Sequence, residues 1–245
     1  MSIFTKSGGY RKLDSFTLAT IIQLGTLRFC QKFLKRDIDP CGRQFDQMTQ
    51  AARSGRANII EGSERSATSK EMEMKLTDVA RASLGELRGD YEMWLLSLGQ
   101  PPWKRDSHEA QAVFDVSVER PPLQDEHESG IHLLRAAGNF SQWLESEDSA
   151  TAANALLILI SRTIHALNQQ LIAQGKAFEQ EGGFREKLHA ARVESRAVAA
   201  NAPSCPDCEA PMVKRKATQG KYAGQDFWGC TKYSEGCRGR REYEG

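Results

Sequence analysis

Apolar residues recur every three or four positions through the first hundred residues, as they do along one face of an amphipathic helix. The first such stretch predicts a helix that Ser15 caps and that continues to about residue 35. Asp39-Pro40 would then end it, because the residue before a proline is disfavoured in the helical conformation. A second helix is expected over about 42–60, with Gly62 as its stop.

Two further long helices follow from the same periodicity. One would begin at Ser66 or Ser69 and end at Gly99. The other has the clearest seam, with apolar residues at alternating steps of four and three, and is expected between a cap at Ser149 and a stop at Gly182-Gly183. Both carry enough apolar surface to pack against neighbouring helices.

These elements predict a mainly α protein. Three long helices joined by short turns, with a fourth arriving after an insert, favour an antiparallel up-and-down four-helix bundle over residues 1–182. The insert, about 100–148, is less regular, and it is expected to hold a short helix near 107–117 and a longer one near 125–146.

The C-terminal quarter of the chain changes character. Residues 183–200 predict a basic amphipathic linker helix, with a stripe of cations that includes Arg185, Arg192 and Arg196. This stripe fits either a nucleic-acid contact or a plain solvated helix face. Residues 201–245 then hold four cysteines and form a separate small module.

Composition narrows the class of protein. Lys plus Arg number 33 and Asp plus Glu 32, so attraction for a polyanion must come from local clusters of charge. Residues 1–14 lack the apolar core of a signal peptide, and the aliphatic run 155–160 is too short to span a bilayer. The sequence predicts a soluble, cytoplasmic protein without a membrane partner, whose cysteines suit a metal site better than disulfides.

The spacing of the last four cysteines is the strongest chemical signal. Cys205 and Cys208 form a C-x2-C pair, and after twenty-one intervening residues Cys230 and Cys237 form a C-x6-C pair. Two thiolate pairs can close tetrahedrally on Zn²⁺, which favours sulfur ligands. The sequence therefore predicts one structural zinc ion per chain, with no open coordination position for catalysis.

Cations and aromatic rings alternate around these cysteines, a combination that suits single-stranded DNA or RNA because cations follow phosphates and rings stack on bases. The alternative for Phe227 or Trp228 is that at least one of them fills the small core beside the metal. The candidate nucleic-acid contacts of this module are Lys214, Arg215, Lys216, Lys221, Tyr222, Trp228, Lys232, Tyr233, Arg238, Arg240 and Arg241.

Three segments of the module, Cys205-Pro206-Asp207-Cys208, 226–233 and Cys237-Arg238-Gly239-Arg240, resemble the C-terminal four-cysteine zinc ribbons of type IA DNA topoisomerases. The resemblance implies binding of single-stranded DNA or RNA. It does not imply strand cleavage, because it covers only about forty residues and the catalytic tyrosine domain of those enzymes is not found in this chain. Ser234-Glu235-Gly236 departs from the proline that those ribbons usually place before the last cysteine.

Within the predicted bundle, the segments 57–62 and 79–87 are similar to small bacterial four-helix bundle proteins. That family includes proteins encoded in ribosomal RNA intervening sequences and the accessory variability determinants of diversity-generating retroelements. The resemblance implies a homopentameric assembly that holds nucleic acid or a reverse transcriptase. On the bundle the candidate contacts are Arg53, Arg56, Arg81 and Arg88, whose alternative role is in surface ion pairs with Asp46, Asp78, Glu86 or Glu92.

The sequence lacks the common catalytic signatures, with no G-x-x-x-x-G-K-[ST], H-E-x-x-H or G-x-S-x-G. We therefore expect a non-catalytic nucleic-acid-binding adaptor, with no catalytic residues, that assists a reverse transcriptase by binding template RNA or cDNA. The alternative is an oligomeric protein-interaction scaffold whose ribbon is purely structural. A third hypothesis, a nuclease-like site, rests on the acidic residues of the insert, Asp106, Glu109, Asp115, Glu119 and Asp125 together with His108.

Overall fold

The computed structural model describes residues 9–119, 125–181, 186, 188–189, 191–193, 202–219 and 221–243. Within these residues the chain divides into two compact units, one inside 4–181 and the other inside 182–245. The structure is mainly helical with a small three-stranded antiparallel sheet near the C-terminus, which confirms the predicted fold class.

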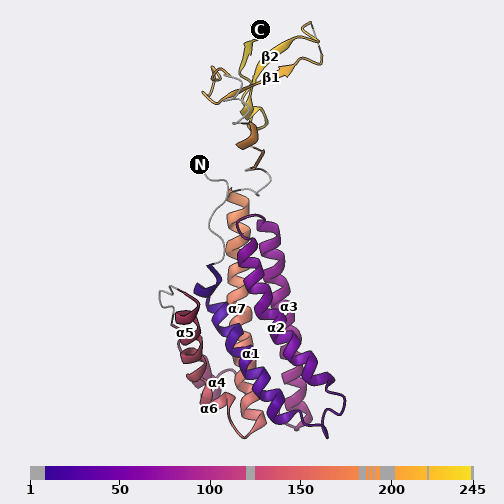
Figure 1. Ribbon diagram of the computed structural model, residues 1–245, viewed down its shortest axis with the longest axis vertical. Helices are drawn as coiled ribbons and strands as arrows, with labels where there is room; N and C mark the ends of the chain where they lie inside the picture. The colour runs from indigo at the N-terminus through magenta and orange to yellow at the C-terminus, as the bar shows by residue number, and fades with distance from the viewer. Residues whose placement is uncertain are drawn as a thin grey trace. The chain divides into compact units, whose positions relative to one another are not determined.

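Four long helices form the first unit (Figure 1). They are α1 (Asp14–Phe33), α2 (Arg43–Arg65), α3 (Lys70–Ser97) and α7 (Ser149–Glu181). Each contacts the next in chain order, and α7 closes the ring against α1. The direction of the closing pair follows from Ser15 bonding Gln170 and from Gly25 facing Leu156, so the bundle runs up-down-up-down as predicted.

The bundle core draws large side chains from all four helices. Small residues let α2 approach α3 closely, because a Cβ on Gly55 would lie 2.9 Å from the side chain of Leu84. Tyr91 is fully buried, and its hydroxyl donates to Thr26 Oγ1 at 3.0 Å, which satisfies its polar end. Fully buried side chains include Phe29, Met48, Leu87, Leu95, Leu156 and Ile160.

Three of the predicted helix boundaries are wrong for identifiable reasons. Ser15 does not cap α1, because it is buried and its hydroxyl donates to Gln170 Oε1 at 2.6 Å. Gly62 does not stop α2; it lies inside that helix, where the lack of a side chain lets it pack against the α3 backbone. The cap of α7 is Asp148, whose carboxylate accepts from the amides of Ala150 and Thr151. The predicted stop at 182–183 lies outside the described residues.

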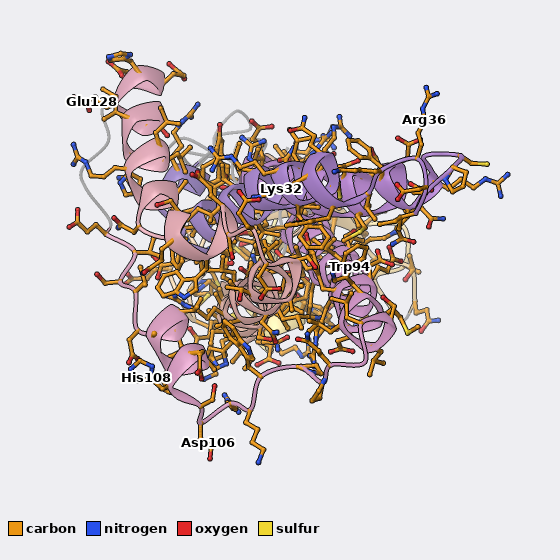
Figure 2. The ribbon with its side chains drawn as sticks, turned by 90° about the horizontal axis from the view of Figure 1, so that it is seen from below. Lys32, Arg36, Trp94, Asp106, His108 and Glu128 are labelled. Carbon is orange, nitrogen blue, oxygen red and sulfur yellow. The ribbon has the colours of Figure 1, made fainter. Side chains whose placement is uncertain are left out.

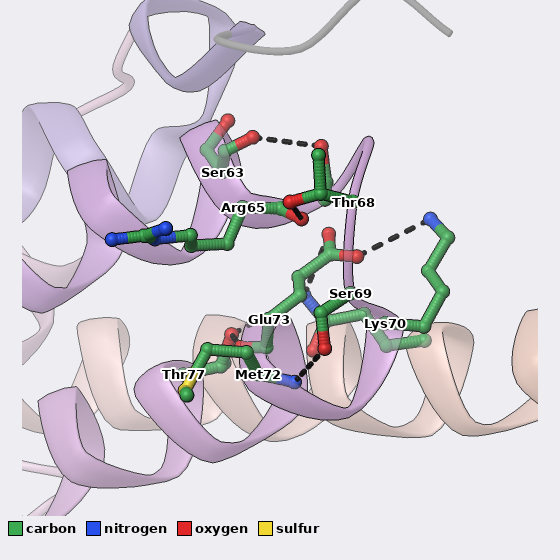
Figure 3. Close-up of polar contacts among 10 residues, drawn as sticks. Ser63, Arg65, Thr68, Ser69, Lys70, Met72, Glu73 and Thr77 are labelled. Atoms are coloured by element: carbon green, nitrogen blue, oxygen red, sulfur yellow. Dashed lines mark hydrogen bonds and ion pairs between the residues drawn. The ribbon is translucent and has the colours of Figure 1, made fainter. Parts of the chain in front are cut away.

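The turn between α2 and α3 matches one of the two predicted starts (Figure 3). Ser69 is the N-cap of α3, and its hydroxyl accepts from the Met72 amide at 3.1 Å. Lys70 and Glu73 form an ion pair at 3.2 Å in the first helical turn. This capping holds the tight reversal that makes α2 and α3 antiparallel neighbours.

The insert packs along the bundle as three shorter helices, α4 (His108–Phe114), α5 (Glu126–Gly138) and α6 (Ser141–Leu144). The single helix predicted over 125–146 is therefore interrupted at Asn139-Phe140, where Phe140 turns into the core. The short helices α4 and α6 contact α7, and α5 and α6 contact α1.

Helix α7 is, by length and composition, the one helix in the described part of the chain that could cross a membrane. Of its most apolar window, 61% is buried inside the bundle. Packing on several sides requires the same apolar surface, so the burial of α7 accounts for its hydropathy.

The second unit holds the sheet, with strands β1 (Met212–Lys216), β2 (Asp226–Cys230) and β3 (Arg240–Glu242) in the order β1-β2-β3. All pairs are antiparallel, and Trp228 lies opposite both Lys214 and Arg241. A short 3-10 helix, η2 (Thr231–Glu235), follows β2 directly.

Candidate metal centre and nucleic-acid interface

The four predicted ligands converge at one end of the small sheet. Their sulfur atoms all lie within 4.8 Å of one another, with Sγ distances of 3.7 Å between Cys205 and Cys237 and 3.5 Å between Cys208 and Cys230. Four sulfurs around a tetrahedral ion with metal–sulfur bonds of about 2.3 Å would be separated by roughly 3.8 Å. The cysteines can therefore hold a metal ion together.

Two tight turns present these sulfurs. The turn at 205–210 is closed by the Cys205 amide donating to the Ala210 carbonyl at 2.8 Å, immediately before β1. Cys230 ends β2, and η2 then leads to Cys237 through Gly236, whose φ of 100° favours glycine. One ligand pair thus precedes the sheet, and the other begins at the end of its central strand.

Backbone amides stabilise negative charge on the sulfurs. The Lys232 amide donates to Cys230 Sγ at 3.3 Å. Burial acts to raise the pKa of Cys205, but amides of Asp207 and Cys208 more than offset it and lower this pKa to about 7. Burial raises the pKa of Cys230 to about 12, so a cation is needed to hold all four sulfurs as thiolates.

Gly239 is a requirement of this site that the sequence analysis did not single out. A Cβ at this position would lie 2.2 Å from Cys205 Sγ and 3.1 Å from an Asp207 carboxylate oxygen. No side chain fits without moving a ligand. The only signal in the sequence is its place two residues after Cys237, where the chain turns around the centre.

Trp228 packs against the small core of the ribbon, which confirms the alternative that Phe227 or Trp228 has a structural role. It is half-buried and packs against Cys205, Met212 and Cys230, which form the small core beside the metal centre. Its outer edge meets the Tyr243 ring, with centroids 5.4 Å apart.

Lys214 lies on the same sheet face as Trp228. Its ammonium group lies 3.8 Å from the centre of the Tyr243 ring and pairs with Asp226 at 3.0 Å, so its charge is already partly compensated.

The opposite sheet face carries a cluster of cations and rings, which we call the arginine face: Arg215, Phe227, Tyr233, Arg238 and Arg240. Arg238 lies 4.1 Å and Arg215 5.5 Å from the centre of the Tyr233 ring. Arg240 lies 5.4 Å from the Phe227 ring. The Arg215 side chain runs across Gly229, where an added Cβ would lie 3.0 Å from Arg215 Cδ. None of the three arginines has an ion pair among the described residues.

The remaining predicted ribbon contacts are exposed. They are Lys216, Lys221, Tyr222, Lys232 and Arg241. Tyr222 belongs to the loop between β1 and β2 and is 62% exposed, so its ring is available. Lys232 lies 3.9 Å from Glu235, a loose surface pair.

The bundle arginines are mostly engaged in contacts of their own. Arg81 pairs with Asp78, and Arg88 pairs with Glu92 at 2.8 Å, which are the surface ion pairs considered as their alternative role. Arg56 is half-buried, donates to Thr20 Oγ1 at 3.1 Å, and lies over the Phe16 ring. Arg53 is exposed beside it.

The linker stripe is described only in part. Arg192 is exposed in a short helical stretch, whereas Arg185 and Arg196 lie outside the described residues.

The insert's acidic residues do not gather into a metal site. In the part of the chain that the structure describes, the four cysteines form the only group of three or more candidate ligands close enough to share an ion. Asp106 and His108 project outward near one end of the insert, while Glu128 lies at the other end (Figure 2). The basis for a nuclease-like site is thereby weakened.

Comparisons with protein-family models, curated proteins and solved structures give no match to this chain.

Proposed function

We propose that this protein is a non-catalytic adaptor that binds single-stranded DNA or RNA through its C-terminal ribbon, which one zinc ion holds in its fold. The observation that carries the proposal is the arginine face. There, three guanidinium groups that have no carboxylate partner among the described residues accompany two aromatic rings beside the four cysteines.

Zinc is the metal that this donor set favours. Four cysteine thiolates in tetrahedral geometry are typical of structural Zn²⁺ sites, and they leave no position for a reactive water. Apart from the cysteines, the described core of the ribbon consists of the buried Met212 with Ala210 and Trp228 packed against it, so the metal would supply most of the folding energy.

The arginine face suits an unpaired strand for two reasons. Guanidinium groups bind phosphate oxygens in a bidentate manner and release condensed counterions. The Tyr233 ring is 46% exposed, and base stacking on such a ring contributes about 1 to 3 kcal/mol. Neither interaction reads the base sequence, so binding should tolerate any sequence.

The bundle would serve as the platform of the adaptor. If copies associate, as the resemblance implies, several ribbons act on one strand and their affinity rises through effective concentration. A reverse transcriptase with its template RNA is the client that the same resemblance implies. The competing function is a protein-interaction scaffold. It is favoured by the ion pairs of Arg81 and Arg88, because arginines paired with carboxylates attract phosphate less.

The test compares two triple variants of the full chain by fluorescence anisotropy with single-stranded DNA and RNA of mixed sequence, at several salt concentrations. One variant replaces the three arginines of the arginine face with alanine. Its matched control replaces Arg36, Arg43 and Lys75, which are exposed on the bundle; Figure 2 shows Arg36 projecting away from it.

We expect the first variant to lose more than tenfold in affinity and its log–log salt slope to fall by about two to three, one for each phosphate contact. The control should bind like the wild type. Equal losses in both variants, with zinc content unchanged, would reject the ribbon as the contact and favour the scaffold.

A further inference from the structure

A cleft separate from the ribbon lies where the insert meets the bundle. It is lined by some residues of the segment 102–114 and by residues of α1, α3 and α7, and it has a volume of about 800 Å³. Small-molecule sites typically enclose about 300–1,000 Å³ and combine an apolar floor with a few polar groups. The cleft has that composition, and neither the metal centre nor the arginine face includes any of its residues.

Apolar and aromatic side chains form its interior. Leu157 and Ile158 of α7 contribute aliphatic surface. Trp103 is half-buried against the bundle core, whereas Phe114, at the end of α4, is 50% exposed. The Arg162 guanidinium lies 5.6 Å from the centre of the Phe114 ring, and the exposed part of this ring can pack against a flat ligand.

The charged groups that line the cleft are mainly cationic. Three arginines and a histidine, namely Arg88, Arg105, Arg162 and His165, face two carboxylates, Asp14 and Glu92. The Arg162 guanidinium is already hydrogen-bonded, because it donates to the carbonyls of Val113 and Val116 at 3.3 and 2.9 Å. Arg88 is paired with Glu92. Arg105 has no ion pair among the described residues, so its charge remains available for an anion.

The backbone around Arg105 is held in place. The Trp103 amide donates to Oδ1 of the buried Asn154 at 2.7 Å, which anchors the segment to α7. The Gln111 side chain donates to the Arg105 carbonyl at 2.7 Å, and Ser107 caps α4 by accepting from the Ala110 amide. A fixed backbone lowers the entropy lost when a ligand is bound, as expected for a preformed site.

We propose that this cleft binds a nucleoside phosphate, either free or as one unit of a strand. Its base would pack against the rings of Trp103 and Phe114, and its phosphate would accept hydrogen bonds from the Arg105 guanidinium. The planar donor fork of arginine matches a phosphate better than a point charge does. The proposal is independent of the ribbon's function, because the two sites share no residue.

The test uses isothermal titration calorimetry on the full chain with adenosine monophosphate, adenosine and inorganic phosphate. Lys104 provides a matched control for Arg105, because it is the neighbouring cation, is also exposed, and does not line the cleft. We expect adenosine monophosphate to bind and Arg105→Ala to weaken it by about tenfold or more, as loss of a charge-assisted hydrogen bond implies. Lys104→Ala should have no effect.

The ring contact has its own variant. Phe114→Leu keeps apolar bulk and removes the aromatic face, and we expect it to weaken adenosine monophosphate several-fold while binding of inorganic phosphate stays unchanged.

The outcomes separate the sources and the alternatives. A competition experiment in the arginine-face variant distinguishes the two sources. If an oligonucleotide displaces adenosine monophosphate, the cleft binds one nucleotide of a strand; if it does not, the cleft binds a free nucleotide. The proposal is overturned if adenosine binds as tightly as its monophosphate, if Lys104→Ala costs as much as Arg105→Ala, or if the wild type does not bind the nucleotide.

Discussion

The bundle and the ribbon reach stable folds by opposite means. The bundle buries large side chains from four long helices, and its polar groups are satisfied internally, as Tyr91 and Thr26 illustrate. The buried core of the ribbon is Cys205, Met212 and Cys230, with Trp228 at its edge. A small core cannot offset the conformational entropy of forty residues, so we expect the ribbon to depend on metal ligation, whereas the bundle depends on packing.

Removal of the metal should produce the largest difference in stability between the ribbon and the bundle. A strong chelator is expected to unfold the ribbon and abolish strand binding, because structural zinc contributes on the order of 10 kcal/mol in comparable modules. The bundle should keep its helical circular dichroism and melt at an unchanged temperature. Equal loss of helical signal from the bundle would show that the two units do not fold independently.

The substitution Gly239→Ala should have a similar but smaller effect. The added methyl group would overlap Cys205 Sγ, so either the sulfur or the turn must move. Strain of about 1.4 kcal/mol would lower metal affinity by about tenfold, and we expect a loss of at least that size. Competition with a chromogenic chelator measures this loss. Gly85→Ala in α3 is the control, because nothing lies within 4 Å of the added Cβ and, as at Gly239, the φ is not positive.

Lower pH should weaken metal binding in the same assay. All four thiols must lose their protons to ligate; backbone amides lower the pKa of Cys205 to about 7, whereas burial raises the pKa of Cys230 to about 12. Affinity should therefore decrease steadily as pH falls from 8 to 6, with protons released on binding. A flat profile over this range would exclude thiolate ligation.

A packing defect should affect only the bundle. Leu84→Ala removes a fully buried side chain that fills the space beside Gly55, and it should lower the free energy of unfolding by about 2–5 kcal/mol. Urea denaturation followed by circular dichroism would record this loss, while zinc content and strand affinity should not change. A loss of zinc in this variant would contradict the separation of the two units.

The sequence was informative where a local rule operates. Ser69 caps α3 as the pattern suggested, and the cysteine spacing located all four members of the metal centre. Local rules failed where a partner helix competes for the same residue. Ser15 forms its hydrogen bond with α7 and does not cap its own helix. Gly62 allows α2 to pack closely against α3 and does not end α2.

The sequence by itself determined the elements of this protein, because helix periodicity and ligand spacing depend on neighbours along the chain. The tertiary structure decided what individual side chains do. It placed Trp228 beside the four cysteines and left Tyr233 exposed near two guanidinium groups, and it placed Arg105 at a cleft with α7. These roles depend on which surfaces meet after folding, and contacts between residues so far apart in sequence leave no local pattern.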